Sequence, residues 1–267
     1  MRDIPRLGLG TYKNEDPDQC AESVRTALEM GYRNVDTAQG YDNESAVGYG
    51  IAAADVARED IYLASKIATG DLAYDDAVAT TRESADKLGV DTIDLMYVHW
   101  PINAYDPERT IDALNDLHDE GTIRDVGLSN FRVDQLDAAM DRLDSELVAH
   151  QVECHPMLPQ NELREHAVEN DYWLVAYCPI ARNQVAEIEA IREVAAKHDA
   201  SPAQVSLAWL LSKENVVAIP KATSEEHIRD NWAARNLALD AEDIERIDGI
   251  EERRRIVDFE EAPWNQG

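Results

Sequence analysis

The stretch Asn34-Val35-Asp36-Thr37-Ala38-Gln39-Gly40-Tyr41-Asp42-Asn43-Glu44 decides how the fold of this chain is interpreted. It starts as a short extended run, breaks at Gly40, and continues as a helical pattern from about Asn43. Asp36 therefore ends a predicted strand, and Tyr41 lies in the loop just beyond it. A carboxylate and a phenol placed in this way can point into one pocket. In the structural alternative, Asp36 caps a turn and Tyr41 packs on a helix.

The same succession of a short apolar run and a helical pattern recurs along the chain. Strands that alternate with helices indicate a parallel sheet. Eight such units in 267 residues favour an α/β fold, the closed (β/α)8 TIM barrel. No linker rich in Pro, Gly or Ser divides the chain, so we expect a single domain over residues 1–267. The expected strands are Arg6–Thr11, Asn34–Ala38, Tyr62–Ile67, Leu95–Trp100, Asp125–Phe131, His150–His155, Leu174–Pro179 and Val216–Lys221.

Helical patterns lie between these strands. The two patterns at Val185–His198 and Pro202–Ser212 predict an extra helix in the seventh unit. A last helix is expected at Asp240–Glu252, and Arg253–Gly267 is expected to form a tail. Further helices are predicted at Gln19–Met30, Asp75–Leu88, Ile111–Glu120 and Val133–Leu143.

The formal net charge is −29, from 54 Asp and Glu against 25 Lys and Arg. The acidic residues recur along the whole chain. Because nucleic-acid binding requires a basic patch, we expect no nucleic-acid partner. Scattered acid with little Lys is typical of salt-loving organisms, in which surface carboxylates keep proteins soluble and salt screens their repulsion. We therefore interpret the chain as halophilic.

The N-terminal residues contain neither a basic region nor an apolar run, so no signal peptide is predicted. No stretch approaches the roughly 20 apolar residues of a membrane helix. We therefore expect a soluble, cytoplasmic protein with no membrane partner. A monomer is also expected. Cys20, Cys154 and Cys178 have no metal-ligand spacing and are expected to be reduced thiols of the core. The histidines have no ligand spacing either, so no metal site is predicted.

Polar residues lie at the expected C-terminal ends of three consecutive strands. Asp36, Lys66 and His99 come from these ends, and Tyr41 follows the first of them. In a TIM barrel the interior is packed, and chemistry takes place at this end of the strands. Since consecutive strands are neighbours in a barrel, we expect the four side chains to meet.

The charges of these four side chains complement one another. Lys66 lies in an apolar strand and is costly to bury alone, so we expect Asp36 to compensate it. An ammonium beside a phenol favours the phenolate and should lower the pKa of Tyr41. His99 can donate or accept a hydrogen bond on the other side. The set would then act as a proton donor near neutral pH; in the alternative, it is a buried ion pair with a packed tyrosine and histidine.

Seven blocks of sequence carry a resemblance to a known family: Leu7-Gly8-Leu9-Gly10-Thr11, Gly31-Tyr32-Arg33-Asn34-Val35-Asp36-Thr37-Ala38, Tyr41-Asp42-Asn43-Glu44, Asp94-Leu95-Met96-Tyr97-Val98-His99-Trp100-Pro101, Val126-Gly127-Leu128-Ser129-Asn130-Phe131, Gln151-Val152-Glu153-Cys154-His155-Pro156 and Ile219-Pro220-Lys221. In these blocks and in their order, the chain resembles the aldo-keto reductase family over nearly its full length. Its expected loops and tail are short, which is similar to the prokaryotic members of the 2,5-diketo-D-gluconate reductase type.

The resemblance implies hydride transfer from a nicotinamide to a carbonyl, with Asp36, Tyr41, Lys66 and His99 as the catalytic tetrad. Tyr41 would protonate the new alkoxide, and Lys66 would lower the pKa of the tyrosine. Asp36 would hold Lys66, and His99 would orient the carbonyl oxygen. The substrate would be a small aldehyde or ketone, such as a keto-sugar acid or a methylglyoxal-like compound.

The resemblance also implies which residues bind the cofactor. Ser129, Asn130 and Gln151 correspond to the group that hydrogen-bonds the nicotinamide carboxamide, a task for which amide and hydroxyl groups are suited. Tyr177 corresponds to the aromatic residue stacked on the nicotinamide ring. In the alternative interpretation, each is a polar residue satisfied at a strand end.

The phosphate end of the cofactor site departs from the family pattern. Lys221 corresponds to the phosphate lysine, but His227 stands where the family has an arginine, and it offers no bidentate fork to a 2′-phosphate. Thr223 and Glu226 have capping-box spacing, which predicts a helix N-terminus facing the phosphate loop. NADPH is the expected cofactor, with NADH possible. The residues assigned to this end are Lys221, Thr223, His227 and Asn231.

Tyr12, Trp100 and Phe131 are expected to line an apolar substrate pocket around the tetrad. Two other functions remain open. One is a non-catalytic subunit that senses nicotinamide nucleotides on the same fold, although the intact tetrad argues against it. The other is a barrel lyase with Lys66 as a Schiff base, although pairing with Asp36 should keep this amine charged and a poor nucleophile.

The acidic composition leads to a prediction about salt. At low ionic strength the repulsion among the surface carboxylates is unscreened, so we expect the protein to lose structure in dilute buffer. Far-ultraviolet circular dichroism, recorded in molar salt and again after dialysis, measures this loss. An unchanged spectrum would contradict the prediction.

Overall fold

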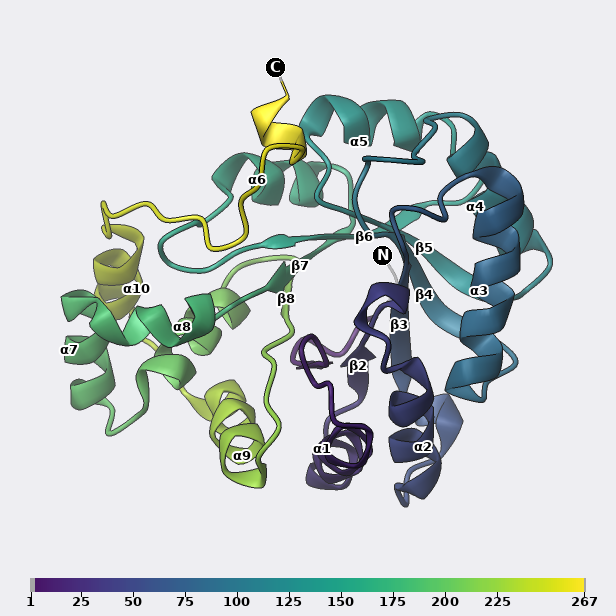
Figure 1. Ribbon diagram of the computed structural model, residues 1–267. Helices are drawn as coiled ribbons and strands as arrows, with labels where there is room; N and C mark the ends of the chain where they lie inside the picture. Colours follow the sequence, from purple (N-terminus) through teal and green to yellow (C-terminus); the bar gives the residue numbers. More distant parts are fainter. Residues whose placement is uncertain (1–2, 267) are drawn as a thin grey trace.

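Eight parallel strands form one sheet in the order β1-β2-β3-β4-β5-β6-β7-β8 in the computed structural model, which describes residues 3–266. Figure 1 shows the sheet curling around a central axis with the helices outside it. The predicted (β/α)8 barrel is confirmed. The strands are β1 Leu9–Gly10, β2 Asn34–Asp36, β3 Tyr62–Ile67, β4 Ile93–Val98, β5 Ile123–Ser129, β6 Leu147–Glu153, β7 Trp173–Tyr177 and β8 Val216–Ala218.

Backbone hydrogen bonds between the first and last strand regions close the barrel. The Gly8 N–H donates to the Ala218 carbonyl at 2.9 Å, and the Gly10 N–H donates to the Pro220 carbonyl at 3.1 Å. β1 and β8 are shorter than predicted, because the segments around them are joined only by isolated bridges such as Leu7 to Ala218 and Gly10 to Lys221. The predicted strand at Leu95–Trp100 is wrong by two residues at each end, since β4 spans Ile93–Val98.

The helices surround this sheet as predicted, with shifts of a few residues at their ends. Two helices, α7 and α8, lie between β7 and β8, which confirms the extra helix of the seventh unit. The α-helices are α1 Pro17–Met30, α2 Glu44–Ala53, α3 Tyr74–Leu88, α4 Arg109–Asp119, α5 Val133–Met140, α6 Asn161–Glu169, α7 Glu189–Lys197, α8 Pro202–Leu211, α9 Glu225–Ala233 and α10 Ala241–Asp248.

The helix predicted at Val185–His198 is wrong in its first turn. A 3-10 segment, η3 at Ala181–Glu187, precedes α7, and Ile188 between them is extended. Within η3, Arg182 and Asn183 have φ of 51° and 70°, in the left-handed region. An α-helix cannot continue through such residues. The segment after β7 is therefore an irregular loop with one α-helix behind it.

Helix α1 shows how local sequence fixes the entry into β2. The Asp16 carboxylate accepts a hydrogen bond from the Gln19 N–H at 2.9 Å, and Pro17 occupies the first turn. Gly31 ends the helix with φ of 118°, a conformation that glycine adopts without steric cost. The chain then enters β2 after only two further residues, which places Asp36 at the mouth of the barrel.

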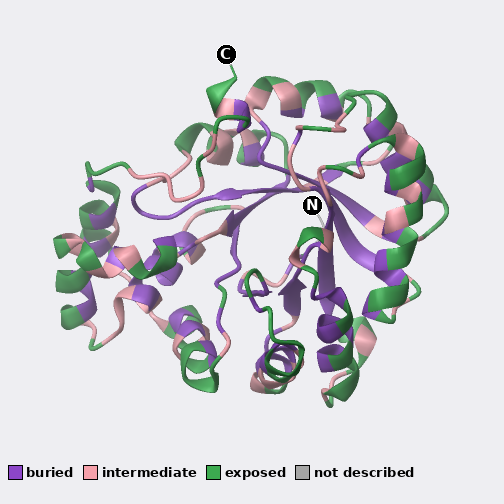
Figure 2. Cartoon of the chain, in the orientation of Figure 1, coloured by how far each residue is buried: buried purple, intermediate pink, exposed green. Residues whose placement is uncertain are grey.

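Alternating side chains along the strands fill two separate cores. In β4, Leu95 and Tyr97 belong to the core inside the barrel, whereas Met96 and Val98 pack in the core beneath the helices. This alternation follows from the two-residue period of a strand. Figure 2 shows the strands buried and the outer faces of the helices exposed. In the described part of the chain, residues 3–266, no helix has the length and apolar character needed to span a bilayer.

Candidate active site

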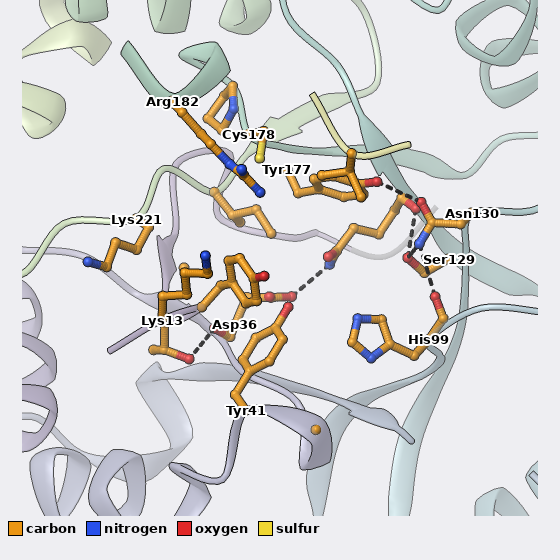
Figure 3. A pocket seen from close by; sticks show the side chains of 18 of the residues that line it. Lys13, Asp36, Tyr41, His99, Ser129, Asn130, Tyr177, Cys178, Arg182 and Lys221 are labelled. Carbon is orange, nitrogen blue, oxygen red and sulfur yellow. Dashed lines mark hydrogen bonds between the residues drawn. The ribbon is translucent and has the colours of Figure 1, made fainter. Parts of the chain in front are cut away.

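A cavity of about 590 Å³ opens at the C-terminal end of the strands. Figure 3 shows labelled side chains from separate strands and loops surrounding it. Asp36, Tyr41 and His99 lie at its base, and Lys66 lies beneath them with 1% of its surface exposed. The structure therefore brings the four predicted tetrad residues together, as neighbouring strand ends require.

The Lys66 ammonium is buried among three oxygen atoms. It is ion-paired with Asp36, donates to the Thr37 carbonyl at 2.7 Å, and lies 3.4 Å from the Tyr41 hydroxyl. The second oxygen of Asp36 accepts from Gln151 Nε2 at 2.7 Å. Burial raises the pKa of Asp36 and lowers that of Lys66, while the attraction between the two charges opposes both shifts. The pair persists because every partner of each charge is in place.

The predicted lowering of the Tyr41 pKa is wrong in this structure. Burial, followed by the nearby Asp36 carboxylate, holds the pKa of Tyr41 well above its ordinary value of 10.0. The Lys66 ammonium is near enough to favour a phenolate, but the adjacent Asp36 carboxylate offsets its charge, and burial of the ring disfavours ionisation. Tyr41 is therefore a phenol that keeps its proton at neutral pH, with the Lys66 ammonium 3.4 Å from its hydroxyl.

His99 is neutral in this site. Burial, with a smaller effect of the Lys66 charge, lowers the pKa of His99 to about 3. Its ring lies edge-on to the Tyr41 ring, with 5.8 Å between centroids. The Asn130 side chain donates to the His99 carbonyl at 3.0 Å, which ties β5 to the end of β4. A neutral imidazole beside the phenol can donate one hydrogen bond to a carbonyl oxygen.

The loop that carries Tyr41 is held by side-chain hydrogen bonds. Thr37 Oγ1 donates to Asn43 Oδ1 at 2.8 Å, and Asn43 Nδ2 donates to the Thr11 carbonyl at 2.9 Å. Gln39 accepts from the Ala68 N–H at 2.8 Å and so ties the loop to the end of β3. These bonds span the loop on both sides of Tyr41, so the phenol is held at a fixed place above Lys66.

Ser129, Asn130, Gln151 and Tyr177 form a continuous polar wall of the cavity. The Tyr177 hydroxyl donates to Asn130 Oδ1 at 2.9 Å, Asn130 Nδ2 donates to Ser129 Oγ at 2.9 Å, and Ser129 Oγ donates to the Gln151 carbonyl at 2.9 Å. Asn130 has φ of 65°, a left-handed conformation that asparagine tolerates. All four predicted residues therefore lie on one side of the cavity. The sequence did not predict the hydrogen bond from Gln151 to Asp36.

At the predicted phosphate end, only Lys221 lines the cavity. Thr223, His227 and Asn231 lie outside its lining; His227 is exposed on α9, and Asn231 is buried. The predicted capping by Thr223 is wrong, because the N-cap of α9 is Ser224, whose hydroxyl accepts from the His227 N–H at 3.3 Å. The helix begins one residue later than the capping-box spacing indicated.

Tyr12 and Trp100 line the cavity as predicted, but Phe131 does not. Phe131 is buried against Tyr105, with 5.4 Å between ring centroids. Phe131 lies two residues after the end of β5, and its ring belongs to the core beneath the helices. The aromatic wall comes instead from Phe259 of the C-terminal tail, which packs on Trp100 at 4.9 Å.

Sequence reasoning also missed two cations and a thiol of the cavity. Lys13, Arg182 and Lys221 lie on its left side in Figure 3, and none of the three forms an ion pair with another residue between 3 and 266. Cys20 and Cys154 are buried as expected, but Cys178 is half-buried and lines the cavity. Burial raises the pKa of Cys178 to about 11, so its thiol stays protonated.

Comparison with known proteins decides the family. The model of the aldo/keto reductase family matches residues 6–252. The chain belongs to this family. The aldo/keto reductase is 38% identical over 257 residues to methylglyoxal reductase DkgB of Escherichia coli O157:H7, with 95% of this chain and 96% of that protein covered. It is 36% identical over 255 residues to glyoxal reductase of Bacillus subtilis (strain 168), with 95% and 91% covered.

Solved structures agree with this assignment. A crystal structure of a candidate 2,5-diketo-D-gluconic acid reductase B superimposes on the aldo/keto reductase with a TM-score of 0.92 at 32% identity, covering 97% of this chain and 92% of that one. MGS-M4, an aldo-keto reductase from a Medee basin deep-sea metagenome library, gives a TM-score of 0.89 at 31% identity and covers 97% of each chain. The predicted family is confirmed.

The neutral state of His99 leads to a prediction about acid stability. Its folded pKa of about 3 lies below the ordinary value of 6.5, so the unfolded chain binds a proton first as pH falls through 6.5. Stability should therefore fall between pH 6.5 and 5, by roughly 1.4 kcal/mol per pH unit from this residue. Urea unfolding at several pH values in molar salt should show a shallower fall for His99→Gln. Parallel curves for the two proteins would contradict this.

Proposed function

We propose that this aldo/keto reductase uses NADPH to reduce small aldehydes and ketones. The observation that carries the proposal is the meeting of Tyr41, Lys66, Asp36 and His99 at the base of one cavity. A reduced nicotinamide, when bound, supplies a hydride to the carbonyl carbon. The chain's own residues then have one remaining task, which is to hold the carbonyl oxygen and give it a proton.

Tyr41 is the proposed proton donor. Its raised pKa means that the proton is present when the carbonyl oxygen gains negative charge. The Lys66 ammonium, 3.4 Å away, would stabilise the phenolate that remains. Asp36 keeps Lys66 charged and in place. His99, being neutral, would donate a hydrogen bond that orients the carbonyl oxygen toward Tyr41.

The lining of the cavity fits a nicotinamide dinucleotide. Three cations lie at one side, and none of them is ion-paired with another residue between 3 and 266. In a chain with a net charge of −29, they suit the phosphates of such a molecule. On the other side, Ser129 and Asn130 offer hydrogen-bonding groups for a carboxamide, and Gln151 lies beside them while also holding Asp36. Tyr177 would stack on the nicotinamide ring. Lys13 and Arg182 thus join Lys221 as proposed phosphate ligands.

NADPH is the proposed cofactor, with NADH also accepted. Lys221 provides a point charge for a 2′-phosphate. The exposed His227 on α9 offers no bidentate fork, and Glu225 and Glu226 in the first turn of that helix oppose further negative charge. Thr223 and Asn231 do not line the cavity, so they would affect cofactor binding only by shaping the loop before α9 and the helix itself. A modest preference for NADPH follows from these opposing effects.

The proposed substrates are small carbonyl compounds of the methylglyoxal and glyoxal class. The similar proteins of Escherichia coli and Bacillus subtilis are named methylglyoxal reductase and glyoxal reductase. The walls offered by Tyr12, Trp100 and Phe259 are aromatic and open to the surface, with Tyr12 43% exposed. Such walls bind a range of small molecules without many specific contacts.

Neither alternative function is favoured. A Schiff base requires a free lone pair on Lys66, but this amine is ion-paired with Asp36 and donates to the Thr37 carbonyl. A nucleotide sensor without catalysis gives no reason for the proton donor to face the cavity. The proposal includes a halophilic, cytoplasmic monomer: the charge of −29 and the free cysteines support the first two, and a cavity complete within one chain supports the third.

The function is tested by turnover with a panel of small aldehydes and NADPH in molar salt. Tyr41→Phe removes the proton donor and should lower kcat by about 10²–10⁴-fold, while NADPH binding stays within a few-fold. Tyr12→Phe, a phenol at the same cavity that the proposal leaves out of proton transfer, serves as the control. Equal activity of Tyr41→Phe and wild type would contradict the proposal.

The cofactor assignment is tested by kcat/KM with each nicotinamide. Wild type should prefer NADPH, and Lys221→Met should lower kcat/KM for NADPH at least tenfold, because one charge-assisted bond to a 2′-phosphate is worth roughly 1.5–3 kcal/mol. His227→Ala should have a much smaller effect. A strong NADH preference of the wild type would overturn the assignment.

A further inference from the structure

Glu153 is a buried carboxylate that the proposed chemistry does not use. It ends β6, has 0% of its surface exposed, and lies outside the lining of the cavity. A charged side chain is rarely found in such a place unless hydrogen bonds compensate the loss of water. Its partners therefore show what the side chain does.

Those partners come mainly from the C-terminal tail, more than one hundred positions away along the chain. Glu153 Oε1 accepts from the Ile256 N–H at 2.6 Å, and Oε2 accepts from the Val257 N–H at 2.7 Å. His155 Nε2 lies 3.0 Å from Oε1 and completes the set. Both carboxylate oxygens are thus engaged by consecutive backbone donors, which clamp the tail on the end of β6.

The clamped segment forms one wall of the cavity. Val257 and Phe259 line the cavity, and Phe259 packs on Trp100 with 4.9 Å between ring centroids. Trp264, further along the tail, also packs on Trp100, with 5.5 Å between ring centroids. Figure 1 shows the tail running from α10 to the ends of α5 and α6, without strand pairing of its own. Its place therefore depends on isolated contacts with the rest of the chain.

This wall lies beyond the residues that the family model matches. The family model ends at residue 252, whereas the wall begins at Ile256. Other anchors hold the two ends of the tail: the Arg254 N–H donates to the Met157 carbonyl at 3.1 Å, and Arg132 donates to the Pro263 carbonyl at 2.9 Å. Between these ends, Glu153 supplies the anchor nearest to the cavity-lining residues.

We propose that Glu153 is a positioning residue that selects larger carbonyl substrates by fixing the tail wall of the cavity. This rests on the proposed reductase function. A small aldehyde can be held by the base of the cavity alone. A substrate with an aromatic group extends to Phe259 and depends on the place of that ring. Glu153 therefore affects KM for the larger substrate and leaves the proton transfer at Tyr41 unaffected.

Glu153→Gln is the sharpest variant. Glutamine has the same shape but offers one oxygen and one N–H2, so one tail N–H faces a donor in place of an acceptor. The variant removes one hydrogen bond and adds a repulsion, without a change in volume. Ile256→Pro reaches the same contact from the tail, because proline has no N–H to donate. Glu261→Gln, an exposed carboxylate of the same tail, is the matched control.

The first measurement is steady-state kinetics with methylglyoxal and with 4-nitrobenzaldehyde. For Glu153→Gln and for Ile256→Pro we expect KM for 4-nitrobenzaldehyde to rise at least fivefold. We expect kcat to fall less than twofold and KM for methylglyoxal to change less than twofold. Phe259→Ala should also raise KM for 4-nitrobenzaldehyde at least fivefold, and adding Glu153→Gln to it should change that KM little. Equal KM changes for the two aldehydes, or no change, would overturn the selection of larger substrates.

The second measurement is amide hydrogen exchange, which needs no activity. In Glu153→Gln the amides of residues 256 and 257 should exchange at least tenfold faster, while β5 amides stay within twofold of wild type. Unchanged exchange at these two amides would overturn the anchoring role. If the wild type reduced no carbonyl compound, the proposed function would fail, and the exchange rates would still decide whether Glu153 anchors the tail.

Discussion

The buried ion pair between Lys66 and Asp36 is the constraint on which the site depends. An ammonium in the apolar interior of a barrel is tolerated only when its charge is compensated and its donors are satisfied. Asp36, the Thr37 carbonyl and the Tyr41 hydroxyl meet these needs from the neighbouring strand and its loop. The parallel order of β2 and β3 is what brings them within reach.

This constraint also explains why the electrostatics of the site differ from a simple pairing of charges. A cation beside a phenol favours ionisation, but here the cation is offset by Asp36 and the phenol ring is largely buried. Desolvation therefore exceeds the attraction, and the pKa of Tyr41 rises. Burial likewise lowers the pKa of His99 and keeps its ring neutral. At neutral pH the site therefore holds a protonated phenol beside a neutral imidazole.

The C-terminal tail is held in place by other interactions than the strands of the barrel. The barrel repeats one unit and fixes each residue through backbone pairing, so its polar side chains reach the cavity from predictable places. The tail has no such pairing and is placed by isolated contacts, among which the Glu153 carboxylate accepts two consecutive backbone N–H groups. The polar side chains of the cavity thus come from the barrel, whereas the C-terminal tail contributes to the shape of the cavity.

The sequence by itself determined the barrel and the four polar side chains that meet at its rim, because strand periodicity is local and the ends of neighbouring parallel strands must meet at one rim. Asp36, Tyr41, Lys66 and His99 could be named for that reason. Tertiary structure alone decided that Phe259 replaces Phe131 in the cavity wall and that Ser224 caps α9. It also decided the sign of the Tyr41 pKa shift, since burial and long-range contacts depend on the packing of distant segments and leave no periodic pattern in the chain.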